Sequence, residues 1–223
     1  MDHSSDDIRS TLVEGLSHLG LTFDSGVIDQ AVAYFLLLLD RNKSVNLISP
    51  KQDIRTQTVI HLVDSFSLLM IKNLPDQLSA LDFGSGGGLP AIPLSLARRG
   101  WHYTLVESTG KKAAFLLSVK EHLRLDSVTV TNSFLEPGKN PENVFYDLIT
   151  ARAVSDMARL AAIAGPRLKR GGYFIAFKGP QGREEIESAA AELKKRRLSL
   201  VDQHDFILPL VEARRSLYLF EKV

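Results

Sequence analysis

Hydrophobic positions change their spacing part of the way along the chain. In the N-terminal part they recur every three or four residues, as in Ile8, Leu12 and Leu16, which predicts amphipathic helices. Farther on, short apolar runs alternate with helical periods, a pattern typical of βαβ units. We therefore expect an α/β fold with a mostly parallel sheet over residues 76–223, preceded by an N-terminal helical extension over residues 1–75.

Each run has bounds that can be read from its flanking polar and turn residues. The predicted strands are Ala80–Phe83, Tyr103–Glu107, Val128–Thr131, Tyr146–Thr150, Tyr173–Lys178, Leu200–Phe206 and Ser216–Glu221. Helices are predicted near Ile8–Leu19, Val27–Arg41, Ile60–Ile71, Ile92–Arg99, Lys111–Leu123, Asp156–Leu168 and Arg183–Arg197. Gly171-Gly172 is expected to break the chain before the fifth strand. No helix separates the last two strands, so we expect an antiparallel pair at one sheet edge.

Composition narrows the function less than the pattern does. The 223 residues suit one α/β domain with an extension, and the formal net charge of +1 predicts no partner by itself. The absence of cysteine excludes disulfides, thiol catalysis and Cys-ligated zinc. The N-terminus is too polar for a secretory signal, and the apolar run Ala31–Leu39 is too short to cross a membrane. We expect a cytoplasmic protein.

The most informative stretch is a glycine loop between the first strand of the sheet and its following helix. Asp82, Gly84 and Gly86 give D-x-G-x-G, and Leu89 stands where a dinucleotide fingerprint needs a third glycine. A diphosphate on the helix N-terminus is therefore disfavoured, whereas a carboxylate beside the loop suits the cationic amino acid group of S-adenosylmethionine. A nicotinamide-dependent oxidoreductase and a plain tight turn are the alternatives.

Glu107 closes the second strand, about 20 residues after the loop, where an acid commonly accepts hydrogen bonds from ribose hydroxyls. A solvated charge at a strand end is the alternative. Strand position and spacing together favour a nucleoside site.

Six blocks together resemble the ribosomal RNA small subunit methyltransferase G family, also called glucose-inhibited division protein B. The blocks are Val45–Ile48, His61–Ser65, Leu81–Pro93 with its G-x-G-x-G-L-P, Leu105–Lys112, Thr150–Ala153 and Phe177–Gly179. The resemblance covers most of the chain from Val45 onward. It implies a class I, Rossmann-like methyltransferase fold with a seven-stranded sheet, S-adenosylmethionine as methyl donor, and N7 of a guanine in 16S ribosomal RNA as acceptor.

The resemblance also implies site residues. Gly84, Leu89, Leu135, Glu136 and Arg152 would contact the cofactor. Two positions depart from the family: Ile60 stands where Arg is usual, and Ala91 where Gly is favoured. The first departure puts part of the RNA-facing polar set in doubt.

Guanine N7 carries a free lone pair, so its methylation needs positioning and no general base. Arg152 and Lys178, at the ends of the fourth and fifth strands, are the candidates for orienting the guanine. The alternatives are a salt bridge at Lys178 and a surface pair between Arg152 and Asp156. His61 is expected, with Asp64 one turn later, to brace the cofactor loop, which we favour over a catalytic dyad.

The partner expected from the resemblance is 16S ribosomal RNA or the small ribosomal subunit. We expect the protein to be a monomer. Candidate phosphate contacts are Lys111-Lys112 and Arg214-Arg215, whereas Lys194–Arg197 reads as an exposed helix end. The histidines show no metal-ligand spacing, so no metal is expected. A methyltransferase with another acceptor and a non-catalytic RNA-binding factor remain alternatives.

Overall fold

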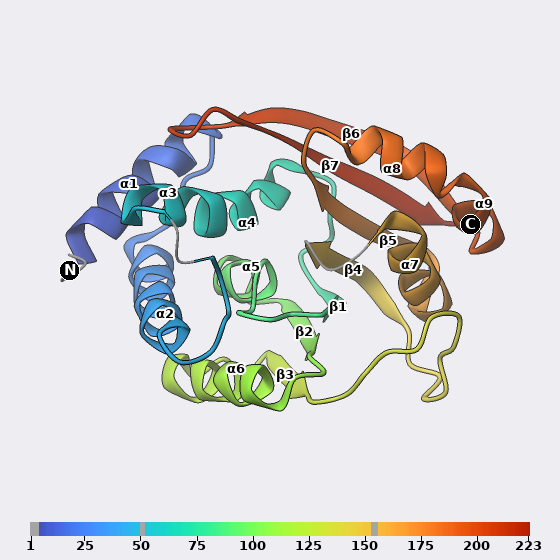
Figure 1. Ribbon diagram of the computed structural model, residues 1–223, viewed down its shortest axis with the longest axis horizontal. Helices are drawn as coiled ribbons and strands as arrows, with labels where there is room; N and C mark the ends of the chain where they lie inside the picture. Colours follow the sequence, from blue (N-terminus) through green and yellow to red (C-terminus); the bar gives the residue numbers. More distant parts are fainter. Residues whose placement is uncertain (1–4, 50–51, 153–155) are drawn as a thin grey trace.

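A single sheet of seven strands runs through the middle of the molecule, as the computed structural model describes it for residues 5–49, 52–152 and 156–223 (Figure 1). The strands are β1 (Leu78–Phe83), β2 (Trp101–Val106), β3 (Val128–Thr131), β4 (Tyr146–Arg152), β5 (Leu168–Lys178), β6 (Leu198–Leu208) and β7 (Ala213–Lys222). Their order is β3-β2-β1-β4-β5-β7-β6. β1 to β5 pair in parallel, and β7 runs antiparallel to both β5 and β6. The predicted α/β sheet with an antiparallel pair at one edge is confirmed.

Helices cover both faces of this sheet (Figure 1). They are α1 (Ser5–His18), α2 (Ser25–Asn42), α3 (Ile54–Thr58), α4 (Asp64–Phe66), α5 (Ala91–Ala97), α6 (Gly110–Leu123), α7 (Met157–Ala164), α8 (Gly182–Ser188) and α9 (Ala190–Lys195). Because successive strand residues point to opposite faces, Ala80 of β1 packs in a core with Phe35 of α2 and Leu116 of α6. Leu81 packs on the other face with Leu160 of α7. The N-terminal helices thus share a core with α5 and α6, while the domain boundary at residue 75 stays a prediction.

The third predicted helix is a continuous segment, Ile54–Met70, whose winding changes along its length. α3 is followed by a π-helical turn (Val59–Val63), then α4, then a 3₁₀ turn (Ser67–Met70). Asp53 caps its start by accepting a hydrogen bond from the Thr56 amide at 2.9 Å. A π turn is uncommon in helices and widens the backbone ring, so its carbonyls become available to other partners.

Several predicted boundaries differ from the observed ones, and two of the differences have clear local causes. β5 starts at Leu168, before the glycine pair, so Gly171-Gly172 lies inside the strand. Gly171 has φ +74° and the register with β4 shifts there, which marks a bulge that the glycine permits. The helix predicted over Arg183–Arg197 is interrupted at Ala189, which divides it into α8 and α9.

Candidate functional site

The glycine loop connects β1 to α5 at the carboxyl end of the sheet, where ligands bind in open α/β folds. Gly84, Gly86 and Gly88 have φ angles of +65°, +53° and +91°, a region that residues with a Cβ rarely adopt. A Cβ on Gly88 would also lie 2.6 Å from Cγ1 of Ile92. The loop conformation therefore requires glycine for both backbone and packing reasons.

Glu107 ties this loop to the end of β2. Its Oε2 accepts a hydrogen bond from the Gly86 amide at 2.9 Å, and its Oε1 accepts one from the Thr109 amide at 2.8 Å. The side chain is buried, so it is not the solvated charge considered above. Each carboxylate oxygen can accept a second hydrogen bond. Glu107 can therefore hold the loop and a ligand hydroxyl at once.

Asp82 lies at the base of the loop with 1 % of its surface exposed. Its Oδ1 accepts a hydrogen bond from Thr150 Oγ1 at 2.8 Å, and its buried Oδ2 has no hydrogen-bond partner among the described residues. Burial raises the pKa of Asp82 to about 7, although the hydrogen bond from Thr150 and the charge of Arg152 act in the opposite direction. An unsatisfied buried acceptor of this kind fits a cationic group supplied by a ligand.

A cavity of about 260 Å³ opens next to Glu107. Its apolar walls come from three neighbouring elements: Phe83 at the end of β1, Leu135 after β3, and Ile163 of α7. Glu136 is instead exposed and pairs with Lys139, at 2.5 Å. Of the two residues expected near the adenine, the structure thus brings only the Leu135 side chain to the cavity.

The glycine loop also packs against the N-terminal helices. The Leu89 side chain is buried in the core formed with the N-terminal helices, so only its main chain faces the loop. The neighbouring Gly87 carbonyl accepts a hydrogen bond of 2.6 Å from the Tyr34 hydroxyl of α2. This buried contact fixes the loop from the helical side, and no local sequence signal predicts it.

Arg152 forms an ion pair with Asp64, and not the surface pair with Asp156 considered above. Its Nη1 lies 3.1 Å from Asp64 Oδ2 and donates to the Ile60 carbonyl at 3.1 Å. Asp64 also pairs with Arg215 of β7, Nε to Oδ1 at 3.3 Å. The side chains of Asp64 and Arg152 are 6 % and 13 % exposed. One buried carboxylate therefore joins helix Ile54–Met70, β4 and β7.

His61 lies in the π turn, within 3.5 Å of Arg152 Nη2 through its Nδ1. Burial and the charge of Arg152 lower the pKa of His61 to about 3, so the ring is neutral at physiological pH. His61 and Asp64 both contact Arg152. His61 and Asp64 were expected to support the cofactor loop, but they support Arg152 at the end of β4.

Basic residues elsewhere form ion pairs, line a groove, or do both. Lys178 pairs with Glu185 of α8 at 2.5 Å, the alternative weighed for it above. Arg214 and Arg215 line a groove of about 470 Å³ together with Arg183. Lys111-Lys112 begin α6, with Lys111 exposed. Within the described residues, no group of His, Cys, Asp and Glu could hold a metal ion. Ala153, the last residue of one family block, lies outside them.

The sheet order, the antiparallel β7 and the glycine loop tied to an acid after β2 define a class I methyltransferase. The chain belongs to the family described as rRNA small subunit methyltransferase G, which it matches over residues 27–214. Methyltransferases of this name from Lysinibacillus sphaericus and Pelotomaculum thermopropionicum are 32% and 34% identical to it. The alignments cover 95% and 97% of this chain and 89% and 91% of theirs.

Solved structures agree on the fold. A methyltransferase from Pyrococcus furiosus has a TM-score of 0.58 at 16% identity, over 86% of this chain and 98% of that one. Geranyl diphosphate C-methyltransferase from Streptomyces coelicolor, solved with S-adenosyl-L-homocysteine, has a TM-score of 0.55 at 13% identity, covering 85% and 98%. The family match favours a methyltransferase over the oxidoreductase alternative. In the part of the chain that is described, no helix is long and apolar enough to span a membrane.

Proposed function

We propose that this chain transfers a methyl group from S-adenosylmethionine to N7 of a guanine in 16S ribosomal RNA. The observation that carries the proposal is the bridge from Glu107 to the Gly86 amide, beside an apolar cavity. A carboxylate suited to ribose hydroxyls, a glycine loop and an apolar pocket suited to a base lie next to one another, which supports the proposal. Membership in the methyltransferase G family supports ribosomal RNA as the acceptor.

Suitable groups surround three parts of the cofactor: the amino group, the ribose and the adenine. The unsatisfied Oδ2 of Asp82 suits the amino group, and the free lone pairs of Glu107 suit the ribose hydroxyls. The cavity at Leu135 suits the adenine, while Gly84 and Gly86 let the backbone approach the ligand. The contacts expected from Leu89, Glu136 and Arg152 by family resemblance stay predictions.

When bound, S-adenosylmethionine supplies an electrophilic methyl group: the N7 lone pair forms the new N–C bond as the C–S bond breaks. The chain has to orient the guanine and exclude water, and it does not have to remove a proton. The neutral, buried His61 agrees with this, because its lowered pKa makes it a poor base. Arg152, held in place by Asp64, and Lys178 at the end of β5 are our candidates for orienting the base.

The groove lined by Arg183, Arg214 and Arg215 is our candidate for contacting RNA phosphates. It lies where β7 begins beside the end of β5. This is the carboxyl end of the parallel strands, where the glycine loop also lies. Asp64 links the groove to Arg152. The planar guanidinium group of arginine matches the geometry of a phosphate, and neutralising RNA phosphates with arginines releases counterions. We expect the protein to act as a monomer in the cytoplasm.

Labelled methyl transfer tests the proposal. Small ribosomal subunits from cells lacking this activity are incubated with the protein and labelled S-adenosylmethionine, and sites of N7 methylation are then mapped by strand cleavage at the modified guanine. We expect label in 16S RNA and one cleavage site, and much less of both with the Asp82→Asn variant when the cofactor concentration is near the wild-type Kd. Label without cleavage would identify another acceptor atom, and no label in RNA would reject the proposal.

A further inference from the structure

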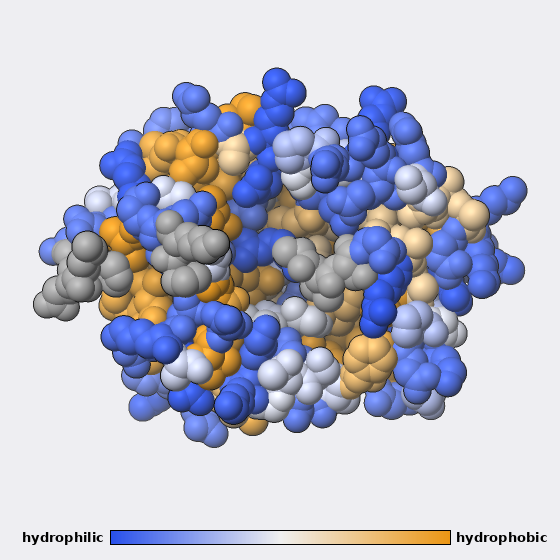
Figure 2. Space-filling view, viewed as in Figure 1, coloured by the Kyte–Doolittle hydropathy of each residue, from blue (hydrophilic) through white to orange (hydrophobic). Residues whose placement is uncertain are grey.

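The outer wall of the cavity beside Glu107 contains an aromatic residue with an unusual exposure. Phe134, in the loop between β3 and β4, is 60 % exposed although it lines the cavity. Apolar side chains reach the surface in the lower right part of the view, where this loop runs (Figure 2). A phenylalanine left largely in water forgoes much of its burial free energy, so an exposed ring at a pocket is available to a ligand that covers it.

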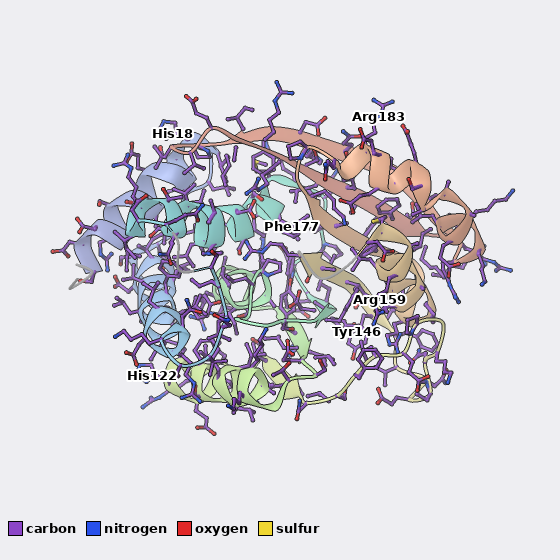
Figure 3. The ribbon with its side chains drawn as sticks, viewed as in Figure 1. His18, His122, Tyr146, Arg159, Phe177 and Arg183 are labelled. Atoms are coloured by element: carbon purple, nitrogen blue, oxygen red, sulfur yellow. The ribbon has the colours of Figure 1, made fainter. Side chains whose placement is uncertain are left out.

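Arg159 is positioned over this ring. It projects from α7 (Figure 3), and its guanidinium carbon lies 5.7 Å from the centroid of Phe134, within cation–π distance. The first turn of α7 is fixed by Asp156, whose Oδ1 accepts a hydrogen bond from the Arg159 amide at 2.9 Å. Arg159 lines the same cavity. A capped helix therefore holds the cation that positions the aromatic ring.

The cavity is also placed for a base. Val106 and Ser108, the two neighbours of Glu107 in the chain, line it together with Gly84 of the loop. A nucleoside whose ribose is bound by Glu107 would therefore project its base between the apolar floor and Phe134. A purine has two π-faces, and an exposed aromatic ring at one side of a narrow cavity is complementary to one of them.

We propose that Phe134, backed by Arg159, stacks on the adenine of the cofactor and is the main side-chain determinant of affinity for the base. This inference rests on the proposed function, because it requires S-adenosylmethionine as the ligand. Base–aromatic stacking is worth about 1–3 kcal/mol by alanine substitution, which corresponds to an approximately 5- to 150-fold change in Kd.

Calorimetric titration with S-adenosylhomocysteine tests the stacking. The variants are Phe134→Ala, Phe134→Tyr, which keeps the ring, and Phe134→Leu, which keeps bulk without it. Phe145→Ala is the matched control, because Phe145 is an aromatic on the same loop, 43 % exposed and absent from the cavity lining. We expect Phe134→Ala to bind at least 5-fold more weakly, Phe134→Leu to remain impaired, and Phe134→Tyr and Phe145→Ala to bind like the wild type.

A second ligand and a second variant separate stacking from other effects. 5′-Methylthioadenosine carries the base without the amino acid end, so Phe134→Ala should weaken it by the same factor. Arg159→Gln should lower both affinities by a smaller factor, because the ring loses its support but remains present. Thermal unfolding of each variant checks that the exposed substitutions leave the fold intact.

The outcomes distinguish this inference from the proposed function. If the wild type fails to bind S-adenosylhomocysteine, the proposed function fails. If the wild type binds and Phe134→Ala binds equally well, the stacking inference is overturned and the methyltransferase assignment stands. Unchanged cofactor affinity combined with weaker binding of small ribosomal subunits would assign Phe134 to the RNA and would likewise overturn the inference.

Discussion

Replacing Asp82 by asparagine should make the protein more stable at alkaline pH and weaken cofactor binding. Burial raises the pKa of Asp82 from 3.8 to about 7. Between these values the unfolded carboxyl is ionised while the folded one keeps its proton, so the folded state binds more protons and stability falls as pH rises. A pKa raised from 3.8 to about 7 corresponds to about 4 kcal/mol of destabilisation of the folded wild type, and this cost is fully present above pH 7.

Asparagine keeps an oxygen for Thr150 but places an NH₂ group where Oδ2 lacks a partner. Burying that unsatisfied donor costs about 1–3 kcal/mol at every pH. At pH 8 the variant should therefore be about 1–3 kcal/mol more stable than the wild type. The stability advantage of the variant over the wild type should be about 3 kcal/mol smaller at pH 5. At that pH the buried carboxyl of the folded wild type keeps its proton, so most of the cost of ionising it is absent.

Urea unfolding of both proteins at pH 5 and pH 8 measures this difference, because titrations common to both cancel on subtraction. Calorimetry with S-adenosylhomocysteine should show weaker binding to Asp82→Asn by about 10- to 150-fold, the worth of one hydrogen bond between charged groups. A stability difference between the two proteins that is the same at both pH values would refute the reasoning about Asp82.

Three further substitutions test the loop and the buried ion pairs. Glu107→Gln keeps the shape but can satisfy only one of the two amides, so cofactor affinity should fall by about tenfold or more in the same calorimetric assay. Asp64→Ala leaves Arg152 and Arg215 without their shared carboxylate and should cost about 3–5 kcal/mol in urea unfolding; a loss below about 1 kcal/mol would contradict the buried pairing. Gly88→Ala should lower stability by about 1–3 kcal/mol through its φ of +91° and its contact with the next helix, and an unchanged thermal midpoint would show that the loop adapts.

The fold was predictable because each buried element has a local signature. Strands such as Tyr103–Glu107 are short apolar runs with turn residues at their ends, and the run of glycines identifies the β1–α5 loop. The boundary errors have local causes as well. Gly171-Gly172 can end a strand or form a bulge within it, and only the pairing with β4 decides between these.

The site was predictable at the loop and at Glu107, where chain position alone sets the geometry. The partner of Arg152 was not, because Asp64 lies 88 residues away and competes with the nearer Asp156. The choice depends on how helix Ile54–Met70 packs against the sheet. The role inferred for Phe134 was missed for a similar reason: nothing local links it to Arg159, which a separate helix supplies.

The π turn at Val59–Val63 sets the direction in which the later side chains of helix Ile54–Met70 point. One residue of an ordinary helix accounts for about 100° of rotation. Regular α-helical winding of the same residues would turn every later side chain by about a quarter-turn and carry Asp64 off both of its arginines, whereas deletion of one residue within the π turn restores regular winding and keeps Asp64 in place. Insertions and deletions should therefore accumulate in exposed connections such as residues 136–145, while between Asp53 and Asp64 we expect only the one-residue deletion that removes the π turn to be tolerated.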